Sequence, residues 1–171
     1  MTEKKEYFLK YILKPLTAWA VLVLVDQGTK YAVRASFYPG ETVQVAPFFQ
    51  LTYLTNTGIA FSMFQGANAV FAIFSAAVVI VFAAWYVKNA PRVDALARAA
   101  MALIMSGATG NLIDRVLFGH VTDFLDFFAG GYHWPSFNAA DSCVSVGGAL
   151  LFIWVIKPAR ATGGKNAADS R

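Results

Sequence analysis

Four apolar segments divide this chain, and polar stretches separate them. The segments cover about residues 13–33, 67–87, 98–117 and 139–157. Each is close to the ~20 residues that a helix needs to cross a bilayer. Segment 67–87 contains no charged residue and ends with Trp85 and Tyr86, an aromatic pair typical of a membrane interface. The pattern therefore predicts four transmembrane helices.

A different periodicity occurs in the connection 34–66. Within 42–53, apolar side chains occupy alternate positions, and Thr and Gln residues lie between them. A period of two is typical of strands with one buried face. Pro47 should interrupt the ladder, because proline lacks the N–H that a central strand donates. We therefore expect a small β-sheet in two pieces, followed by a turn at residues 55–58.

The composition supports a membrane protein. Of the 171 residues, 57% are hydrophobic and 14% are charged, whereas soluble domains average about 25% charged residues. Eleven of the 14 Lys and Arg residues lie in 1–14, 88–98 and 157–171. Basic residues gather on the cytoplasmic side of a membrane protein. Both termini should therefore be cytoplasmic, and the net charge of +4 gives no reason to expect nucleic acid as a partner.

Polar residues gather at one end of three predicted spans. In this topology, that end faces away from the cytoplasm. An ionisable group in a membrane segment is costly and is a functional candidate by default. These residues should converge in one layer of the membrane: Asp26, Asn111, Asp114, Arg115, Asn138 and Asp141.

Two nearby carboxylates that share a proton can hydrolyse a peptide bond. One acts as general base on water, and the other donates a proton to the scissile carbonyl. Spacing alone leaves the pair open. Asp123 and Asp141 are preferred because each lies at an element boundary. The candidate carboxylates are Asp26, Asp114, Asp123, Asp126 and Asp141.

Other chemistries have weaker support in the sequence. His120 and His133 occur without HExxH or comparable metal-ligand spacing. Ser142 lacks a base placed by spacing, and the lone Cys143 excludes an intramolecular disulfide. A small transporter or ion pathway stays open as an alternative. Such a pathway needs polar groups through the full membrane depth, and the inner halves of these spans are apolar.

Five motifs in the order of one known family run from residue 26 to 142. They are DQGTK (26–30), NTGIAF (56–61), GNLIDR (110–115), GHVTDF (119–124) and FNAADS (137–142). With them the chain resembles the lipoprotein signal peptidases (signal peptidase II), which are bacterial inner-membrane aspartic peptidases. The resemblance implies Asp123 and Asp141 as the catalytic pair. It implies a substrate-binding shell of Asn56, Gly58, Asn111, Asp114, Arg115 and Asn138, and supporting roles for Asp26 and Lys30.

The resemblance also implies a fold and a substrate. We expect an all-α membrane protein with four transmembrane helices in one domain, residues 1–160. A small extracytoplasmic β-sheet should form a cradle, a short interfacial helix should lie within 118–137, and 161–171 should be a disordered cytoplasmic tail. The implied substrate is a diacylglyceryl-modified prolipoprotein in the bacterial inner membrane, cleaved just before its lipidated cysteine near the outer face. No metal or other cofactor is implied, and we expect a monomer in contact with membrane lipid.

Simpler roles remain open for several of these residues. Asp141 could only cap a helix, Arg115 could be a snorkelling anchor, and Asn56 could be a turn residue. The pair Asp26 and Lys30 is equally compatible with structure and function. Asp126 lies outside the motifs, so we expect it on a solvated face.

Overall fold

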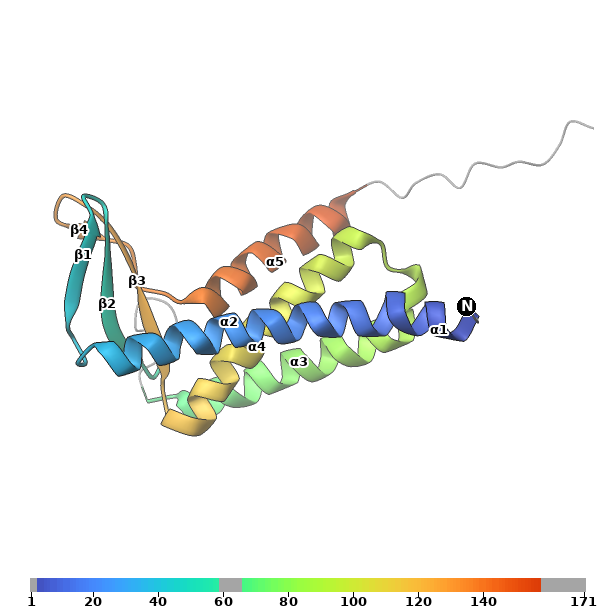
Figure 1. Cartoon of the computed structure of the whole chain (residues 1–171), viewed down its shortest axis with the longest axis horizontal. Coiled ribbons are helices and arrows are strands. Elements are labelled where there is room, and N and C mark those ends of the chain that lie inside the picture. Colours follow the sequence, from blue (N-terminus) through green and yellow to red (C-terminus); the bar gives the residue numbers. More distant parts are fainter. Residues whose placement is uncertain (1–2, 59–65, 158–171) are drawn as a thin grey trace, which may run out of the picture.

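The computed structural model describes residues 3–58 and 66–157 of the chain. Four long helical segments run side by side, and a small sheet lies at one end of them (Figure 1). The helical segments are long and apolar enough to cross a membrane: Glu3–Ser36, Asn68–Arg92, Ala95–Phe118 and Ala139–Ile156. They cover the four apolar segments of the sequence. The expected disordered tail, 161–171, lies outside the described residues.

The first helical segment is longer than the apolar pattern indicates. It comprises α1 (Glu3–Phe8), a π-helical stretch (Leu9–Leu13) and α2 (Lys14–Ser36). The Glu, Lys and Leu residues of this polar start are good helix formers. The helix therefore begins well before the apolar run.

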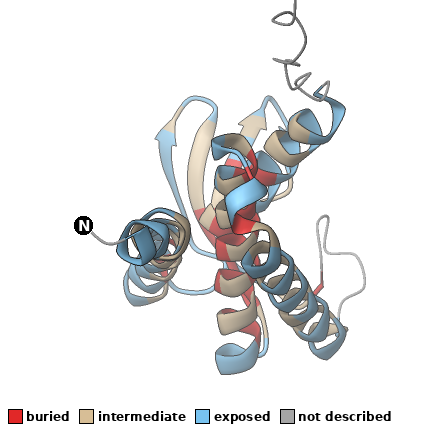
Figure 2. Cartoon of the chain, turned by 90° about the vertical axis from the view of Figure 1, so that its right-hand side faces the viewer, coloured by how far each residue is buried: buried red, intermediate tan, exposed pale blue. Residues whose placement is uncertain are grey.

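α4 (Ala95–Phe118) is the central helix. It packs against α2, α3 (Asn68–Asn89) and α5 (Ala139–Ile156), and a 3₁₀ turn (Ala90–Arg92) follows α3. Many of the buried residues belong to α4 (red in Figure 2). Gly107 lies against the backbone carbonyl of Ala140 and the side chain of Val144, and a Cβ at Gly107 would collide with both. Small residues of this kind let two transmembrane helices approach closely.

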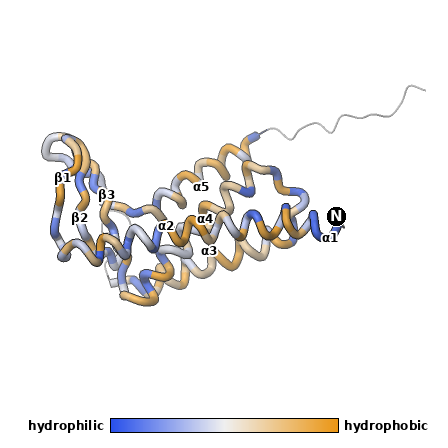
Figure 3. The backbone as a smooth tube through the Cα atoms, viewed as in Figure 1, coloured by the Kyte–Doolittle hydropathy of each residue, from blue (hydrophilic) through white to orange (hydrophobic). Residues whose placement is uncertain are grey.

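Large apolar side chains cover the outside of the helices. Leu24, Ile73 and Val155 are 70%, 71% and 66% exposed, and hydrophobic residues recur along every long helix (Figure 3). Soluble proteins rarely expose apolar surface on this scale. In a bilayer the same side chains contact lipid, so the packing agrees with four membrane spans.

The sheet has four antiparallel strands in the order β1-β2-β3-β4. They are β1 (Thr42–Ala46), β2 (Phe49–Asn56), β3 (Val121–Ala129) and β4 (Tyr132–His133). The expected strands within 42–53 are confirmed, and Pro47 lies in the turn between β1 and β2. Under the sheet, Tyr53 and Phe124 pack against Val33 of α2. This small core fixes the sheet to the end of the helices.

One detail of the strand pattern is wrong. Val43 and Val45 of β1 are 46% and 59% exposed, although their alternation with polar residues predicts a buried face. β1 is the edge strand and pairs with β2 alone. The strand Thr42–Ala46 is therefore held by its backbone hydrogen bonds to β2 and not by burial of an apolar face.

The expected interfacial helix within 118–137 is also wrong. This region contains β3 and β4 instead, and all of its residues are described. β3 pairs along β2, with Phe49 opposite Phe127 and Asn56 opposite Val121. The polar and apolar residues of 123–128 alternate in a way that fits a strand as well as a helix. The edge of β2 that β1 does not occupy offers backbone N–H and C=O groups, and β3 pairs with them. The strand brings Asp123 to the end of α4.

Candidate active site

Asp123 lies on β3, where the sheet meets the helices. Its side chain is 3% exposed and accepts two hydrogen bonds. Asn56 Nδ2 of β2 donates to one carboxylate oxygen at 3.0 Å, and Asn138 Nδ2 donates to the other at 2.7 Å. Burial, together with the nearby charge of Asp141, raises the pKa of Asp123 to about 7, against the lowering effect of the two amides and of Lys30. Asp123 therefore holds a proton up to neutral pH.

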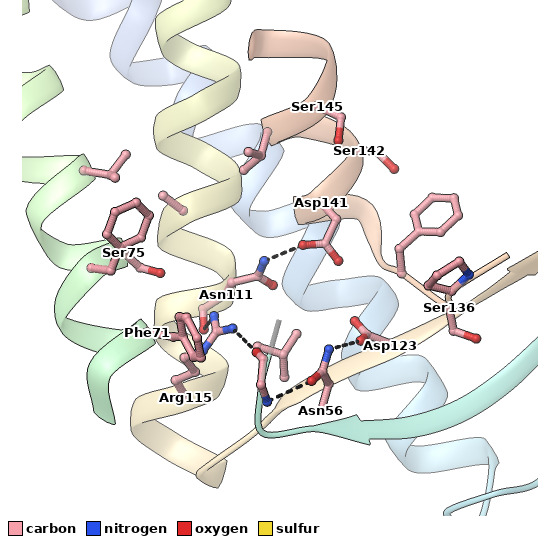
Figure 4. A pocket seen from close by; sticks show the side chains of 18 of the residues that line it. Asn56, Phe71, Ser75, Asn111, Arg115, Asp123, Ser136, Asp141, Ser142 and Ser145 are labelled. Carbon is pink, nitrogen blue, oxygen red and sulfur yellow. Dashed lines mark hydrogen bonds between the residues drawn. The ribbon is translucent and has the colours of Figure 1, made fainter. Parts of the chain in front are cut away.

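Asp141 lies in the first turn of α5 and faces the same space (Figure 4). Asn138 is the N-cap residue of α5, and its side chain accepts from Asp141 N at 3.0 Å. In return, Asp141 accepts from Asn138 N at 3.2 Å, which completes a capping box. The other oxygen of Asp141 accepts from Asn111 Nδ2 at 2.8 Å. Asp141 is thus a capping residue, as the simpler reading allows, and also a wall of the shared cavity.

Asn111 of α4 is held in one orientation by its neighbours. Lys30 Nζ donates to Asn111 Oδ1 at 2.9 Å, and Asn138 Nδ2 lies 3.3 Å from the same oxygen. Both contacts require an oxygen at this position, so the Asn111 nitrogen must face Asp141. The buried ammonium of Lys30 therefore positions a hydrogen-bond donor at the candidate pair without touching the pair.

Asp26 and Lys30 do not line the cavity with the candidate pair and belong to a buried ionic cluster. Lys30 Nζ is 3.0 Å from Asp26 and 3.5 Å from Asp114, and the Lys30 side chain is fully buried. Asp26 also accepts from Ala140 N at 2.9 Å, next to the start of α5. Asp26 and Lys30 pair with each other within α2, and their further contacts with Asp114 and Ala140 N connect α2 with α4 and α5.

Asp114 is placed behind the sheet and does not line the cavity. Its carboxylate accepts from Thr122 N of β3 at 2.9 Å and lies 3.4 Å from Arg34 Nη1. Thr122 precedes Asp123 directly, so Asp114 fixes the backbone that carries the candidate catalytic carboxylate. The resemblance implies a substrate-binding role for Asp114, whereas its contacts place it as a support for the backbone of β3.

Arg115 points in a different direction from Asp114, as adjacent helical residues must. Its Nη2 donates to Gly58 O at 3.1 Å, and its guanidinium lies 5.7 Å from the ring centroid of Phe71. Arg115 does not pair with Asp26, whose cationic partner is Lys30. Among the described residues, buried Arg115 Nε has no hydrogen-bond partner. Arg115 lines the cavity, and its Nε–H is a hydrogen-bond donor that no other described residue uses.

A cavity of about 690 Å³ joins these groups. Its polar side is formed by Asn56, Asn111, Arg115 and the two candidate carboxylates (Figure 4). Its other walls are largely apolar and come from α3, α4, α5 and the segment 134–137. They include Phe71, Phe74, Val78, Ile104, Val144 and Val146. The arrangement can hold a polar backbone at one side and an apolar chain at the other.

Asp126 is not on a solvated face, which corrects the sequence interpretation. The residue is 5% exposed. It accepts from Gln50 Nε2 at 2.6 Å and lies 2.9 Å from His133 Nδ1. β3 alternates in direction, so Asp126 points to the opposite face from the phenylalanine beside it, where the neighbouring strands supply polar partners. Asp126 links β2 to β4 and stays outside the cavity.

Sequence reasoning missed two members of the buried cluster. Arg34 donates to Thr122 Oγ1 at 3.0 Å and contacts Asp114. Gln27 Nε2 donates to Asp26 at 3.0 Å and to Gly110 O at 3.0 Å. Arg34 follows Lys30 by four residues, as Lys30 follows Asp26, so helical spacing could have indicated it.

The other chemical alternatives have no assembled site in the described residues. No group of three or more His, Cys, Asp and Glu side chains there could hold a metal ion. His133 contacts Asp126, and His120 lies beside the Phe118 ring. Ser142 Oγ donates to the backbone carbonyl of Asn138 at 3.1 Å. None of these contacts builds a nucleophile with an adjacent base.

Known proteins resemble this chain over most of its length. The family model Peptidase_A8, described as signal peptidase (SPase) II, matches residues 18–157. A lipoprotein signal peptidase of Alteromonas mediterranea is 39% identical over 155 residues, which is 89% of this chain and 85% of the relative. One from Paraburkholderia phymatum is 44% identical over 136 residues, 77% of this chain and 80% of the relative.

The fold is also that of a solved protein. A bacterial membrane enzyme determined at 2.3 Å resolution by the in meso method aligns with a TM-score of 0.80 and 30% identity. The alignment covers 93% of this chain and 96% of the solved chain. The four long helices and the four-stranded sheet therefore form a known membrane-enzyme architecture.

Proposed function

Because the chain belongs to the signal peptidase II family and is an aspartic peptidase of that type, we propose that Asp123 and Asp141 are its catalytic pair. The observation that carries this assignment is that both carboxylates line one cavity. Asp26 and Asp114 are buried as well, but both pair with cations: Lys30 contacts each of them, and Arg34 contacts Asp114. Membership of this peptidase family also excludes the alternative of a small transporter or ion pathway.

In the proposed mechanism, the pair shares one proton. Asp123, whose pKa is raised to about 7, supplies the protonated member at neutral pH and donates to the scissile carbonyl oxygen. Ionised Asp141 removes a proton from a water molecule as that water attacks the carbonyl carbon. The C–N bond then breaks, and the leaving amine takes a proton from the pair. Asn56, Asn111 and Asn138 hold the carboxylates in place by the hydrogen bonds described above.

The proposed substrate is a prolipoprotein whose cysteine carries diacylglyceryl, cleaved just before that cysteine. The cavity supports this choice, because it combines polar groups with apolar walls. Phe74 and Val146 of those walls are 65% and 52% exposed, so the cavity extends to the surface that lipid covers. Arg115 Nε, which has no hydrogen-bond partner among the described residues, is a suitable donor to a substrate backbone carbonyl.

This multi-pass bacterial membrane protein is proposed to lie with both termini in the cytoplasm. The distribution of basic residues supports that orientation. The catalytic pair then lies near the outer face of the inner membrane, within a single four-span domain that acts as a monomer. Substrate can reach it sideways from the bilayer.

The assignment of the pair is tested with the purified protein and a diacylglyceryl-modified lipobox peptide. Asp123→Asn and Asp141→Asn should each lower turnover at least about 10³-fold, since neither can share the catalytic proton. The same peptide without lipid should be cleaved poorly by the wild type.

Asp94→Asn is the matched control. Asp94 caps the opposite end of α4 by accepting from Ala97 N at 3.0 Å, and asparagine caps a helix equally well. This variant should keep full turnover. Substantial cleavage by folded Asp123→Asn or Asp141→Asn protein would refute the pair, and lipid-independent cleavage would refute the substrate class.

A further inference from the structure

A second cavity lies at the end of the helices opposite the sheet. It has a volume of about 170 Å³ and is formed by the first helical segment, the end of α3 and the start of α4. Its walls are almost entirely apolar. Among the described residues that line it, Arg98 is the one with a charge; the others include Leu16, Trp19, Val87, Met101 and Met105. An apolar groove thus has a single cation in its wall.

Pro15 shapes the helix beside this groove. Proline has no N–H, so the carbonyl of Tyr11, four residues earlier, lacks its usual helical donor. The chain is π-helical over Leu9–Leu13, just before this proline. Tyr86 Oη of α3 donates to Tyr11 O at 2.8 Å and satisfies the carbonyl. This contact fixes the first segment against α3 and keeps the Tyr11 ring near Arg98.

Two cations lie beside that ring. The Arg98 guanidinium is 5.7 Å from the Tyr11 ring centroid, and Lys10 Nζ is 5.2 Å from it. Within the described part of the chain, neither cation forms a salt bridge. Arg98 donates to the carbonyl of Val93, and the nearest acidic residue in sequence, Asp94, caps α4. The ring face attracts both cations, but their charge is not neutralised.

We propose that this groove is a binding site for an anionic phospholipid. The phosphate lies against Arg98 and Lys10, and an acyl chain lies along Leu16, Trp19 and Met101. A zwitterionic lipid can fill the apolar part but carries no net charge for the two cations. A free anion can contact the cations but gains nothing from the apolar walls. The site is separate from the proposed catalytic cavity.

Trp19 is a reporter inside the groove. A variant with Trp85→Phe, Trp134→Phe and Trp154→Phe keeps Trp19 as its single tryptophan. Brominated phosphatidylglycerol, which quenches tryptophan on contact, is titrated into the detergent-solubilised protein at low salt, in parallel with brominated phosphatidylcholine. Phosphatidylglycerol should bind more tightly, by about fivefold for each cation.

Substitutions then test the headgroup contact. Arg98→Gln and Lys10→Gln should each reduce the preference for phosphatidylglycerol about fivefold, whereas Arg98→Lys should keep it. Arg92→Gln is the control, because Arg92 is an exposed cation in the adjacent turn that neither lines the groove, as Arg98 does, nor lies beside the Tyr11 ring, as Lys10 and Arg98 do. Lys10 is exposed, so its variant decides the question if Arg98→Gln fails to fold.

Equal quenching by the two lipids would overturn the proposal and leave an ordinary acyl-chain contact. Loss of the preference in Arg92→Gln would overturn it as well, because the attraction would then be general to this end of the protein. Inorganic phosphate at millimolar concentration should not displace the brominated lipid. Displacement would show a phosphate site rather than a phospholipid site.

Discussion

At the scale of single residues, the neighbours of each aspartate decide its chemistry. Asp26 and Asp114 lie within 3.5 Å of Lys30, whereas Asp123 is surrounded by amides and a second carboxylate. All of these side chains are buried or nearly so. Asp26 and Asp114 are therefore members of the buried ionic cluster, whereas Asp123 lines the cavity and has a raised pKa. Their different roles follow from these surroundings.

The raised pKa of Asp123 predicts the pH dependence of turnover. Asp123 donates a proton in the proposed mechanism, and it loses that proton as the pH rises through its pKa of about 7. The kcat/KM for the lipopeptide, which reports the pKa values of the free enzyme, should therefore decline above pH 7, by about tenfold for each further pH unit. A rate that stays constant from pH 7 to 9 would contradict this role of Asp123.

Thermal unfolding provides a control that does not depend on turnover. The unfolded chain releases the Asp123 proton near its ordinary pKa of 3.8, and the folded protein releases it near 7. Between these values the folded state binds more protons, so stability falls as the pH rises. Asp123→Asn removes this effect. The Tm of the variant minus that of the wild type should increase from pH 4 to pH 7 and then level off.

Asn138 combines a capping role and a site role in one side chain. Ser is a comparable N-cap but lacks the Nδ2 donor to Asp123. We therefore expect Asn138→Ser to lower turnover while unfolding changes little. Asn138→Ala should also lose about 1 kcal/mol of stability. Equal turnover in the wild type and Asn138→Ser, measured with the lipopeptide, would show that Asn138 serves only as a cap.

At the scale of elements, the contact between α4 and α5 sets the geometry of the site. Asn111 on α4 donates to Asp141 on α5, and this short bond needs the two helices to be close. Gly107 lies one turn before Asn111 and contacts the backbone of α5 directly. The absence of a side chain at Gly107 therefore places the Asn111 amide within reach of Asp141.

Two glycine variants separate helix packing from helix propensity. Gly107→Ala should separate α4 from α5 and reduce both Tm and turnover, because its Cβ meets the backbone carbonyl of Ala140. A cost of about 1–3 kcal/mol is typical for an overpacked contact. Gly148→Ala on α5 has open space around its Cβ and should be neutral. Equal effects of the two substitutions would contradict the close-packing argument.

At the scale of the whole molecule, one buried ionic cluster joins the parts that build the cavity. Lys30 and Arg34 come from α2, Asp114 comes from α4, and Asp26 reaches the backbone at the start of α5. Asp114 also holds the first residues of β3. The cluster therefore fixes the sheet, α4 and α5 relative to one another.

Removal of Lys30 should destabilise the whole protein. Lys30→Met leaves Asp26 and Asp114 buried with less compensation, which typically costs about 3–5 kcal/mol. It also frees Asn111 to rotate away from Asp141, so turnover should be reduced even at temperatures at which the variant is folded. Lys88→Met, at an exposed position near the end of α3, is the control and should change neither quantity. Wild-type stability in Lys30→Met protein would refute the structural role of the cluster.

The sequence by itself determined the features that depend on local pattern and on motif. Apolar runs of bilayer length predict the four helices, because a span must bury its apolar side chains in lipid or in the protein, and the alternation of apolar and polar residues predicts β1 and β2, although the apolar side of β1 is exposed. The motif match identified the family. The same reasoning failed for residues 118–137, where aromatic content did not distinguish a helix from a strand that pairs with β2.

Only the tertiary structure decided which polar residues meet. Asp126 and Asp123 lie three residues apart on one strand, yet Asp126 links neighbouring strands and Asp123 lines the cavity. Asp114 supports β3 from behind, and Arg34 joins it from another helix. A hydrogen bond or ion pair between residues some 80 positions apart depends on how the helices and the sheet pack. That packing is a property of the whole chain, so no local pattern records it.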